Sequence, residues 1–342
     1  MPIVQLRNMI AILLAMVSGT SIANAQSVEE FYRGRLVKLL VSAAVGGGAD
    51  LYARVFARHF GRHIPGQPTF VVQNIPGAAG LTLAGQLQNT APRDGSVIGV
   101  LQRNNLAEPL FADHDIGFDP RRLNWLGSLN KDTYVIIGWH TASVKTIDDA
   151  LQRELVLGNT GGGTENVTFP LLLNRTLGTK FKLVRGYKGS DELALAIERG
   201  EVQGRAITWA TMRSEHASWL ADRKVNLLVQ MATERHPDLP NVPSVLDYAT
   251  NPSDRQLFEL MFAPLKAGRP IALPPGTPPD RLAALRKAFV ELADDREFLA
   301  EIASRGTSVE LLAGDETQTL VADLYRTPPD VVAKARAIRG QR

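Results

Sequence analysis

Two glycine-rich loops constrain this 342-residue chain more than any other feature. The first loop contains residues 46–48 and the second residues 161–163, and all six positions are glycine. Each loop follows an apolar, strand-like segment and precedes a helix-like segment, so it leaves bare N–H groups at a helix start, where an anion is favoured. Because the loops lie far apart in the sequence, we expect them to face each other from two lobes and to hold a small anionic molecule.

The first 25 residues have the pattern of a cleaved secretory signal peptide. Arg7 is the only charged residue before position 29, residues 9–17 are apolar, and Ala23-Asn24-Ala25 forms a small-residue cleavage site. The apolar run is shorter than the roughly 20 residues that span a bilayer. The sequence therefore predicts cleavage after Ala25 and a periplasmic mature protein.

Composition and motifs exclude several classes of function. Loss of Arg7 with the leader lowers the net charge from +3 to +2, and no basic, aromatic-rich strand suggests nucleic acid binding. The chain has no cysteine, so it contains neither disulfides nor thiolate ligands. The first loop lacks the last glycine of a dinucleotide fingerprint, and no Walker A motif occurs. His59 and His63 have metal-ligand spacing but no third ligand in register. We expect no cofactor, no metal and no nucleic acid partner.

Alternating β-branched and amphipathic segments predict an α/β fold. Strands are expected over residues 36–42, 69–73 and 96–102 in the first half, and over 134–139, 155–159, 182–185, 202–208 and 225–231 in the second. A helical tail follows the proline-rich segment 273–279. We predict two lobes, each a mixed, mostly parallel sheet flanked by helices. Lobe 1 contains residues 26–131 and 262–342, lobe 2 contains residues 132–261, and strands near 130–134 and 261–272 form the hinge.

Polar residues at the two predicted helix starts have two interpretations. Asp50 follows the first glycine loop, where a carboxylate can cap the helix or accept a hydrogen bond from a ligand. Thr164 and Asn166 stand at the start of the second helix and carry the same ambiguity.

Three further side chains stand near the ends of predicted strands, where ligands of open α/β sheets bind. Arg103 and Arg205 could each form a bidentate hydrogen bond with a ligand carboxylate there, although a surface role is also open. Trp209 could form an aromatic wall of the cleft or belong to the core.

The chain resembles the periplasmic solute receptors of tripartite tricarboxylate transporters, also called Bug receptors, over about residues 32–338. The motifs that carry the resemblance occur in the family's order: GGGAD at 46–50, NIPGAAG at 74–80, APRDG at 91–95, GYKGS at 186–190, GEVQG at 200–204, RHPDLPNVP at 235–243 and PGTP at 275–278.

The resemblance implies a two-lobed fold of the type II periplasmic binding proteins. It also implies a receptor that binds a small organic carboxylate and delivers it to a membrane permease. Because no later apolar run is long enough to span a membrane, we expect the mature protein to be soluble, and we expect a monomer. By the resemblance, loops that follow strands hold the ligand: Gly46, Gly47, Gly48, Asp50, Gly77, Ala78, Gly80, Gln102, Arg103, Asn104, Thr160, Gly161, Gly162, Gly163, Thr164 and Asn166.

The sequence departs from the family pattern around the expected site. Ala43-Ala44-Val45 replaces the usual aromatic-Pro-Pro, and Gln102-Arg103-Asn104 replaces small hydroxyl residues. Arg205 and Trp209 also replace smaller or acidic residues, so the identity of the ligand does not follow from the resemblance. We predict an extracytoplasmic solute-binding protein that captures a small organic carboxylate by hinge closure. A secreted α/β enzyme or a sensory receptor acting on a similar acid remains an alternative.

Overall fold

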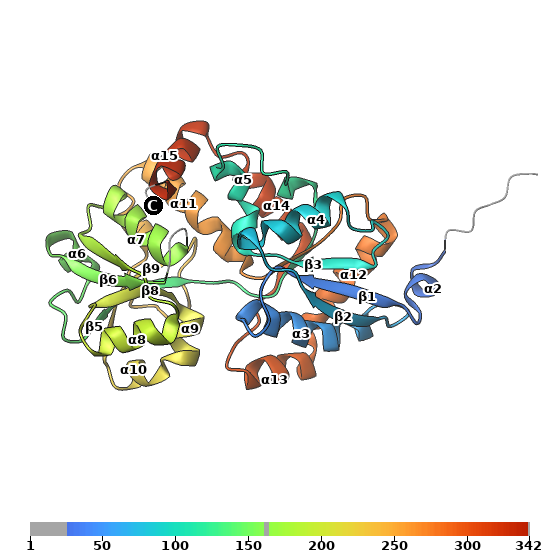
Figure 1. The fold of residues 1–342 in the computed structure, drawn as a ribbon, viewed down its shortest axis with the longest axis horizontal. Coiled ribbons are helices and arrows are strands. Elements are labelled where there is room, and N and C mark those ends of the chain that lie inside the picture. The colour runs from blue at the N-terminus through green and yellow to red at the C-terminus, as the bar shows by residue number, and fades with distance from the viewer. Residues whose placement is uncertain (1–25, 161–163, 341–342) are drawn as a thin grey trace, which may run out of the picture.

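The computed structural model describes residues 26–160 and 164–340. The expected signal peptide at residues 1–25 and the three glycines at 161–163 lie outside the described residues. The described chain forms two mixed β-sheets, each flanked by helices (Figure 1). The α/β architecture expected from the sequence is therefore confirmed.

The first sheet has six strands in the order β11-β4-β10-β3-β1-β2. Three neighbouring strands are parallel: β1 (Leu36–Val41), β2 (Thr69–Asn74) and β3 (Val97–Val100). The other three pair antiparallel: β4 (Asn124–Ser128), β10 (Pro270–Leu273) and β11 (Leu312–Ala313). Helices precede, join and follow these strands: α2 (Val28–Tyr32), α3 (Gly48–Phe60), α4 (Leu81–Asn89), α5 (Glu108–Phe111), α12 (Pro279–Glu291), α13 (Arg296–Ser304) and α14 (Gly314–Leu324).

The second sheet has five strands in the order β7-β6-β8-β5-β9. Its parallel strands are β6 (Leu155–Asn159), β7 (Phe181–Arg185) and β8 (Gly204–Thr208), and β5 (Tyr134–Trp139) runs antiparallel to β8 and β9 (Val225–Met231). Its helices are α6 (Ile147–Gln152), α7 (Glu165–Thr176), α8 (Ser190–Glu198), α9 (Trp209–Glu215) and α10 (Ala217–Ala221).

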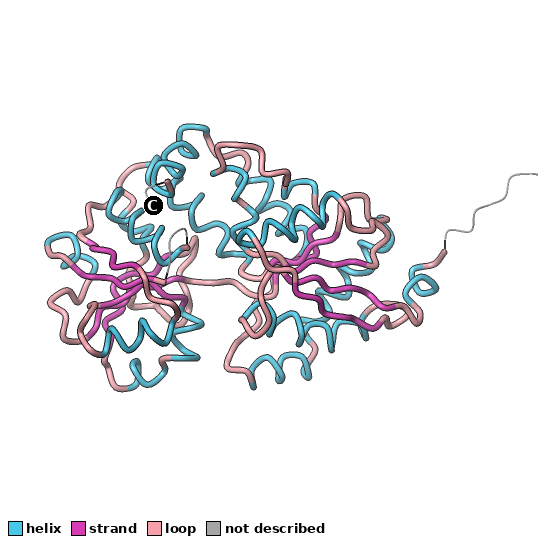
Figure 2. The backbone as a smooth tube through the Cα atoms, in the orientation of Figure 1, coloured by secondary structure: helices cyan, strands magenta, loops and turns pink. Residues whose placement is uncertain are grey.

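The chain crosses between the sheets twice. The first crossing follows β4 and is extended, and Figure 2 draws it as loop. The second crossing runs through helix α11 (Pro252–Phe262) and a 3₁₀ helix (Ala263–Ala267) before it enters β10. The expectation of a strand over residues 261–272 is wrong for its first half, because Leu257, Phe258 and Phe262 at helical spacing are buried in the core.

The C-terminal helix α15 (Pro329–Arg339) packs against α11, α5 and α7, so it touches helices associated with both sheets (Figure 1). Within the part of the chain that the structure describes, no helix combines the length and apolar character that a membrane crossing requires.

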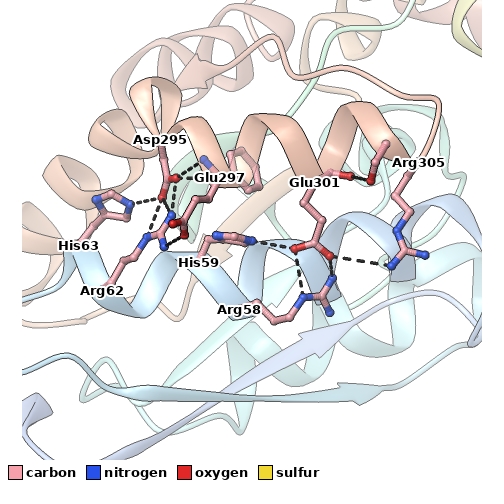
Figure 3. A network of polar contacts seen from close by, with 10 residues as sticks. Arg58, His59, Arg62, His63, Asp295, Glu297, Glu301 and Arg305 are labelled. Atoms are coloured by element: carbon pink, nitrogen blue, oxygen red, sulfur yellow. Dashed lines mark hydrogen bonds and ion pairs between the residues drawn. The ribbon is translucent and has the colours of Figure 1, made fainter.

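Helix α3 begins at the first glycine loop, and its position is fixed from two sides. Tyr52, Val55, Phe56 and Phe60 recur at helical spacing and are buried against the first sheet. On its other side, Arg58 and His59 pair with Glu301 of α13 (Figure 3). Just after the end of α3, Arg62 and His63 pair with Asp295, the N-cap residue of α13, and Arg62 also pairs with Glu297.

These ion pairs strongly favour the charged carboxylates. Burial alone would raise the pKa of Asp295, but hydrogen bonds from Arg62 hold that pKa well below its usual range. Hydrogen bonds from Arg58 and His59 lower the pKa of Glu301 to about 2. The C-terminal segment therefore braces the helix that presents the glycine loop.

Candidate ligand-binding cleft

A cavity of about 470 Å³ lies where the two halves of the molecule meet. This volume is within the range of small-molecule sites. Its lining comes from the loop before α3, from the 3₁₀ helix Arg103–Leu106, from the start of α7, and from the segment that returns to β10. The lining residues are Ala43, Gly47, Gly48, Ala49, Ala79, Gln102, Arg103, Asn104, Ala107, Phe111, Thr164, Glu165, Thr168, Phe169, Met261, Pro264, Leu265, Arg269 and Arg339.

The first glycine loop opens α3 onto this cavity. Gly46 has φ of +90°, and its N–H donates to the Asp50 carboxylate at 2.9 Å. Gly47 occupies the N-cap position and provides no side-chain cap, so it leaves the first-turn N–H groups of Gly48 and Ala49 uncapped at the cavity. The loop therefore combines bare donors with the positive end of a 13-residue helix.

Asp50 holds the loop from behind and does not line the cavity. Its carboxylate accepts hydrogen bonds from Arg54 Nε and Asn74 Nδ2, each at 2.9 Å, in addition to the one from Gly46. The hydrogen bond from Arg54 is the main reason why the pKa of Asp50 falls to about 2. These contacts favour a structural role for Asp50, which holds the glycine loop through Gly46 and does not cap the helix.

The turn at residues 77–80 supports a second wall of the cavity. Four consecutive residues have positive φ, and two of them, Ala78 and Ala79, are not glycine. Gly80 is required because a Cβ there would lie 2.6 Å from Asn105 Oδ1. The Ala79 carbonyl accepts from Asn105 at 3.1 Å and from Asn104 at 3.3 Å. The strained turn is thus tied to the segment that carries Gln102, Arg103 and Asn104.

Arg103 lies in the cavity wall but its guanidinium is already engaged. Nε donates to Glu165 at 2.8 Å, Nη2 donates to the Tyr134 hydroxyl at 3.1 Å, and Nη1 donates to Asp132. Burial alone would lower the pKa of Arg103, but the neighbouring carboxylates raise it above its usual value. Arg103 in turn lowers the pKa of Glu165 against the effect of burial. Arg103 therefore acts as a bridge between the two halves.

The second glycine loop is described only at its ends. Asn166 Nδ2 donates to Thr160 Oγ1 at 3.0 Å, and Thr164 Oγ1 hydrogen-bonds to Asn166. Thr164 and Glu165, at the start of α7, line the same cavity as the first loop. The expected contacts of Gly161, Gly162 and Gly163 lie outside the described residues.

Two expected site residues lie away from the cavity lining. Arg205 is buried on β8, where Nη1 donates to Ser190 Oγ at 3.1 Å, and burial lowers its pKa. Trp209 begins α9 within an apolar cluster, and its indole N–H donates to Asp238 at 3.3 Å. The structure therefore brings the glycine loop and the segment at 102–104 together, but it places these two side chains elsewhere.

Sequence reasoning missed the arginines that the C-terminal half contributes. Arg269 precedes β10, and Arg339 ends α15, where it pairs with Glu108 at 2.8 Å. Phe111, Phe169 and Met261 add an apolar wall. Position 269 could have been suspected, because a segment that connects two lobes borders the space between them. Nothing local marks Arg339. Within residues 26–160 and 164–340, no cluster of three or more His, Asp or Glu side chains could hold a metal ion.

Comparisons with known proteins identify relatives of this chain. A family model described as the tripartite tricarboxylate transporter family receptor, TctC, matches residues 53–335. A Cupriavidus necator protein, described as a UPF0065 protein in the gbd 5′ region, is 26% identical over 297 residues, which is 83% of each chain.

Solved structures share the fold at low sequence identity. A TctC solute-binding protein from Polaromonas, solved without ligand, has a TM-score of 0.70 at 20% identity and covers 91% of this chain and all of its own. A Rhodopseudomonas palustris protein solved with adipate has a TM-score of 0.62 at 20% identity, and the match covers 89% of this chain and 97% of that protein. MatC from Rhodopseudomonas palustris, solved with malate, has a TM-score of 0.61 at 20% identity, and the match covers 87% of this chain and 99% of that protein.

Proposed function

The chain belongs to the tripartite tricarboxylate transporter family of receptors, and from this premise we propose that it captures a small organic carboxylate in the cavity between its lobes. Members of this family are solute-binding receptors and not enzymes. One observation carries the choice of ligand: among the described lining residues, a bare helix start and the incompletely paired Arg269 present positive charge, while the one carboxylate, Glu165, is bound by Arg103. The bound malate and adipate of two structural relatives support the same class.

The carboxylate binds at the first glycine loop in this proposal. Gly47, Gly48 and Ala49 donate from the backbone, while Thr164 lines the same cavity from the start of α7. A hydrogen bond to a charged acceptor contributes roughly 1.5–3 kcal/mol. About four such bonds, less the cost of association, reach the roughly 8 kcal/mol of micromolar binding. Closure of the lobes then excludes water from the ligand.

Thermal denaturation in the presence of single ligands tests this function. The panel contains malate, adipate, hexanoate and the neutral diamide of adipate. At 100 times its dissociation constant a ligand stabilises by about 2.7 kcal/mol, which raises the melting temperature of a chain of this length by about 4 °C. We expect a shift with acids and none with the diamide. The proposal fails if no acid binds, or if the diamide binds as tightly as adipate.

A pair of glycine variants locates the binding site. Gly47→Asp adds a carboxylate beside the bare N–H groups and should abolish the rise in melting temperature that the ligand causes. Gly85→Asp makes the same change on α4, where a Cβ would meet no heavy atom within 4 Å, and should leave ligand binding unchanged. Equal loss of binding in both variants would contradict the assigned site.

We further propose that the receptor delivers its ligand to a membrane permease from the periplasm. The family supports this partnership, and the leader-like residues 1–25 support the location. Deletion of the gene should abolish uptake of the acid that the purified protein binds. Unchanged uptake in the deletion strain would contradict delivery and favour a sensory role.

A further inference from the structure

We propose that Arg269 directly binds the carboxylate of the ligand beside the first glycine loop, and that the ligand has a hydrocarbon body. This inference rests on the proposed function, because it places the same ligand in the same cavity. It adds a side-chain contact and a substrate class to an interaction otherwise made by the backbone.

Two of the three arginines in the cavity wall already have close partners. Arg103 donates to Glu165, Asp132 and Tyr134. Arg339 pairs with Glu108 at 2.8 Å, and its guanidinium lies 4.2 Å from the centre of the Phe111 ring. The positive charges of both residues are therefore compensated within the protein.

Arg269 is the exception among these three arginines. Its Nη1 donates only to the carbonyl of the preceding Gly268, at 2.7 Å, and its buried Nε has no hydrogen-bond partner within the described residues. Asp132 lies 3.7 Å from Nη1, and this carboxylate is already bound by Arg103. A guanidinium with so little compensation, 22% exposed and facing a cavity, is suited to an anion from outside the protein.

The Arg269 guanidinium lies beside the first turns of α3, close to Tyr52 and Gly48. Its guanidinium lies 5.6 Å from the centre of the Tyr52 ring, on the second turn of α3. The Tyr52 hydroxyl donates to the Ser308 carbonyl and hydrogen-bonds to Thr307, both at 2.6 Å, so this ring is fixed. A Cβ placed on Gly48 would lie 3.2 Å from Arg269 Nη2.

Arginine and helix start therefore present positive charge to the same space. The first turn of α3 has no side-chain cap, and Nη2 of Arg269 lies close to it, because a Cβ on Gly48 would be 3.2 Å from that atom. Without an anion these two groups repel each other, and with a carboxylate between them both are satisfied. Gly48 keeps that space open, since a side chain there would press on the guanidinium.

The remaining wall of the cavity determines the body of the ligand. Phe111, Phe169, Met261, Pro264 and Leu265 line it with apolar atoms. Burying a methylene group against such a wall contributes about 0.8 kcal/mol, whereas burying an unpaired hydroxyl is unfavourable. We therefore expect aliphatic carboxylates such as hexanoate and adipate to bind more tightly than hydroxylated acids such as malate.

A cycle of two ligands and two proteins tests the contact with Arg269. Hexanoate and the neutral hexanamide are titrated by calorimetry into the wild type and into Arg269→Met. We expect the wild type to prefer hexanoate by at least about 30-fold and the variant to lose most of this preference. Arg269→Lys keeps the positive charge but cannot form two parallel hydrogen bonds to a carboxylate, so it should recover only part of the preference for hexanoate. Arg296→Met, an exposed arginine on α13, is the matched control and should bind like the wild type.

The outcomes separate this inference from the proposed function. If Arg269→Met retains the wild-type preference for the acid, the role of Arg269 is wrong while carboxylate binding stands. If malate binds and neither hexanoate nor adipate does, the hydrocarbon body is wrong. If the wild type binds none of these acids, the proposed function itself fails. Should Arg269→Met not fold, the same comparison with Arg269→Lys decides: full wild-type preference there refutes the need for two parallel hydrogen bonds, and a partial loss supports it.

Discussion

Replacing Arg103 with Met should destabilise the protein, because it leaves the Glu165 carboxylate without its ion-pair partner. Glu165 loses the Nε–H donor at 2.8 Å, whereas Asp132 keeps the contact from Arg269 at 3.7 Å. Removal of one partner of a buried ion pair costs about 3–5 kcal/mol. Because the Glu165 side chain is 27% exposed, water reduces this cost, and we expect about 2–4 kcal/mol.

Melting temperatures measure this effect, with a second substitution as the control. The entropy of unfolding is about 2.1 cal/mol/K per residue, so 2–4 kcal/mol lowers the melting temperature of this chain by about 3–6 °C. Neutralising the stranded group in the double variant Arg103→Met/Glu165→Gln should restore at least half of that loss. A single variant as stable as the wild type, or a double variant no more stable than the single, would refute the bridging role of Arg103.

Three further predictions concern the first lobe. Gly127→Ala should cost more than about 3 kcal/mol in urea unfolding, because Gly127 has φ of +145° and a Cβ would lie 2.2 Å from Phe289; a cost under 1 kcal/mol would contradict it. Glu301, with its pKa lowered to about 2, stabilises the fold above about pH 4.5 and loses this contribution as the pH falls towards 2. Glu301→Gln should therefore lower the melting temperature at pH 7 but little at pH 2.5; an equal loss at both would exclude this origin. Gly48→Ala should weaken carboxylate binding by about tenfold, since its methyl group lies 3.2 Å from Arg269 Nη2, and unchanged affinity in calorimetry would count against the site.

Local patterns predicted the elements that depend on local interactions. The strands Tyr134–Trp139, Leu155–Asn159 and Val225–Met231 have the bounds that their β-branched runs indicated. Helix α11 was missed although local signals mark it, because Asn251 caps its start, Pro252 begins it and its buried apolar residues recur at helical spacing. Its packing against α15, in contrast, involves residues distant in the sequence and has no local signal.

The same distinction applies to the candidate site. The first glycine loop was visible in the sequence because glycines at a strand–helix junction are a local signal. The partners of Arg103 are not local, since Asp132 lies 29 residues away and Glu165 lies 62 residues away. Arg269 is marked by no motif, and its place beside Gly48 arises only when the chain returns to the first sheet.

The structure of the protein with adipate bound tests the central claim most directly. We predict one carboxylate in the cavity, within hydrogen-bond distance of the Gly48 or Ala49 N–H and of the Arg269 guanidinium, with the methylene chain against Phe111 and Phe169. Adipate seated elsewhere, or in the cavity with both carboxylates away from the first turn of α3, would contradict the account.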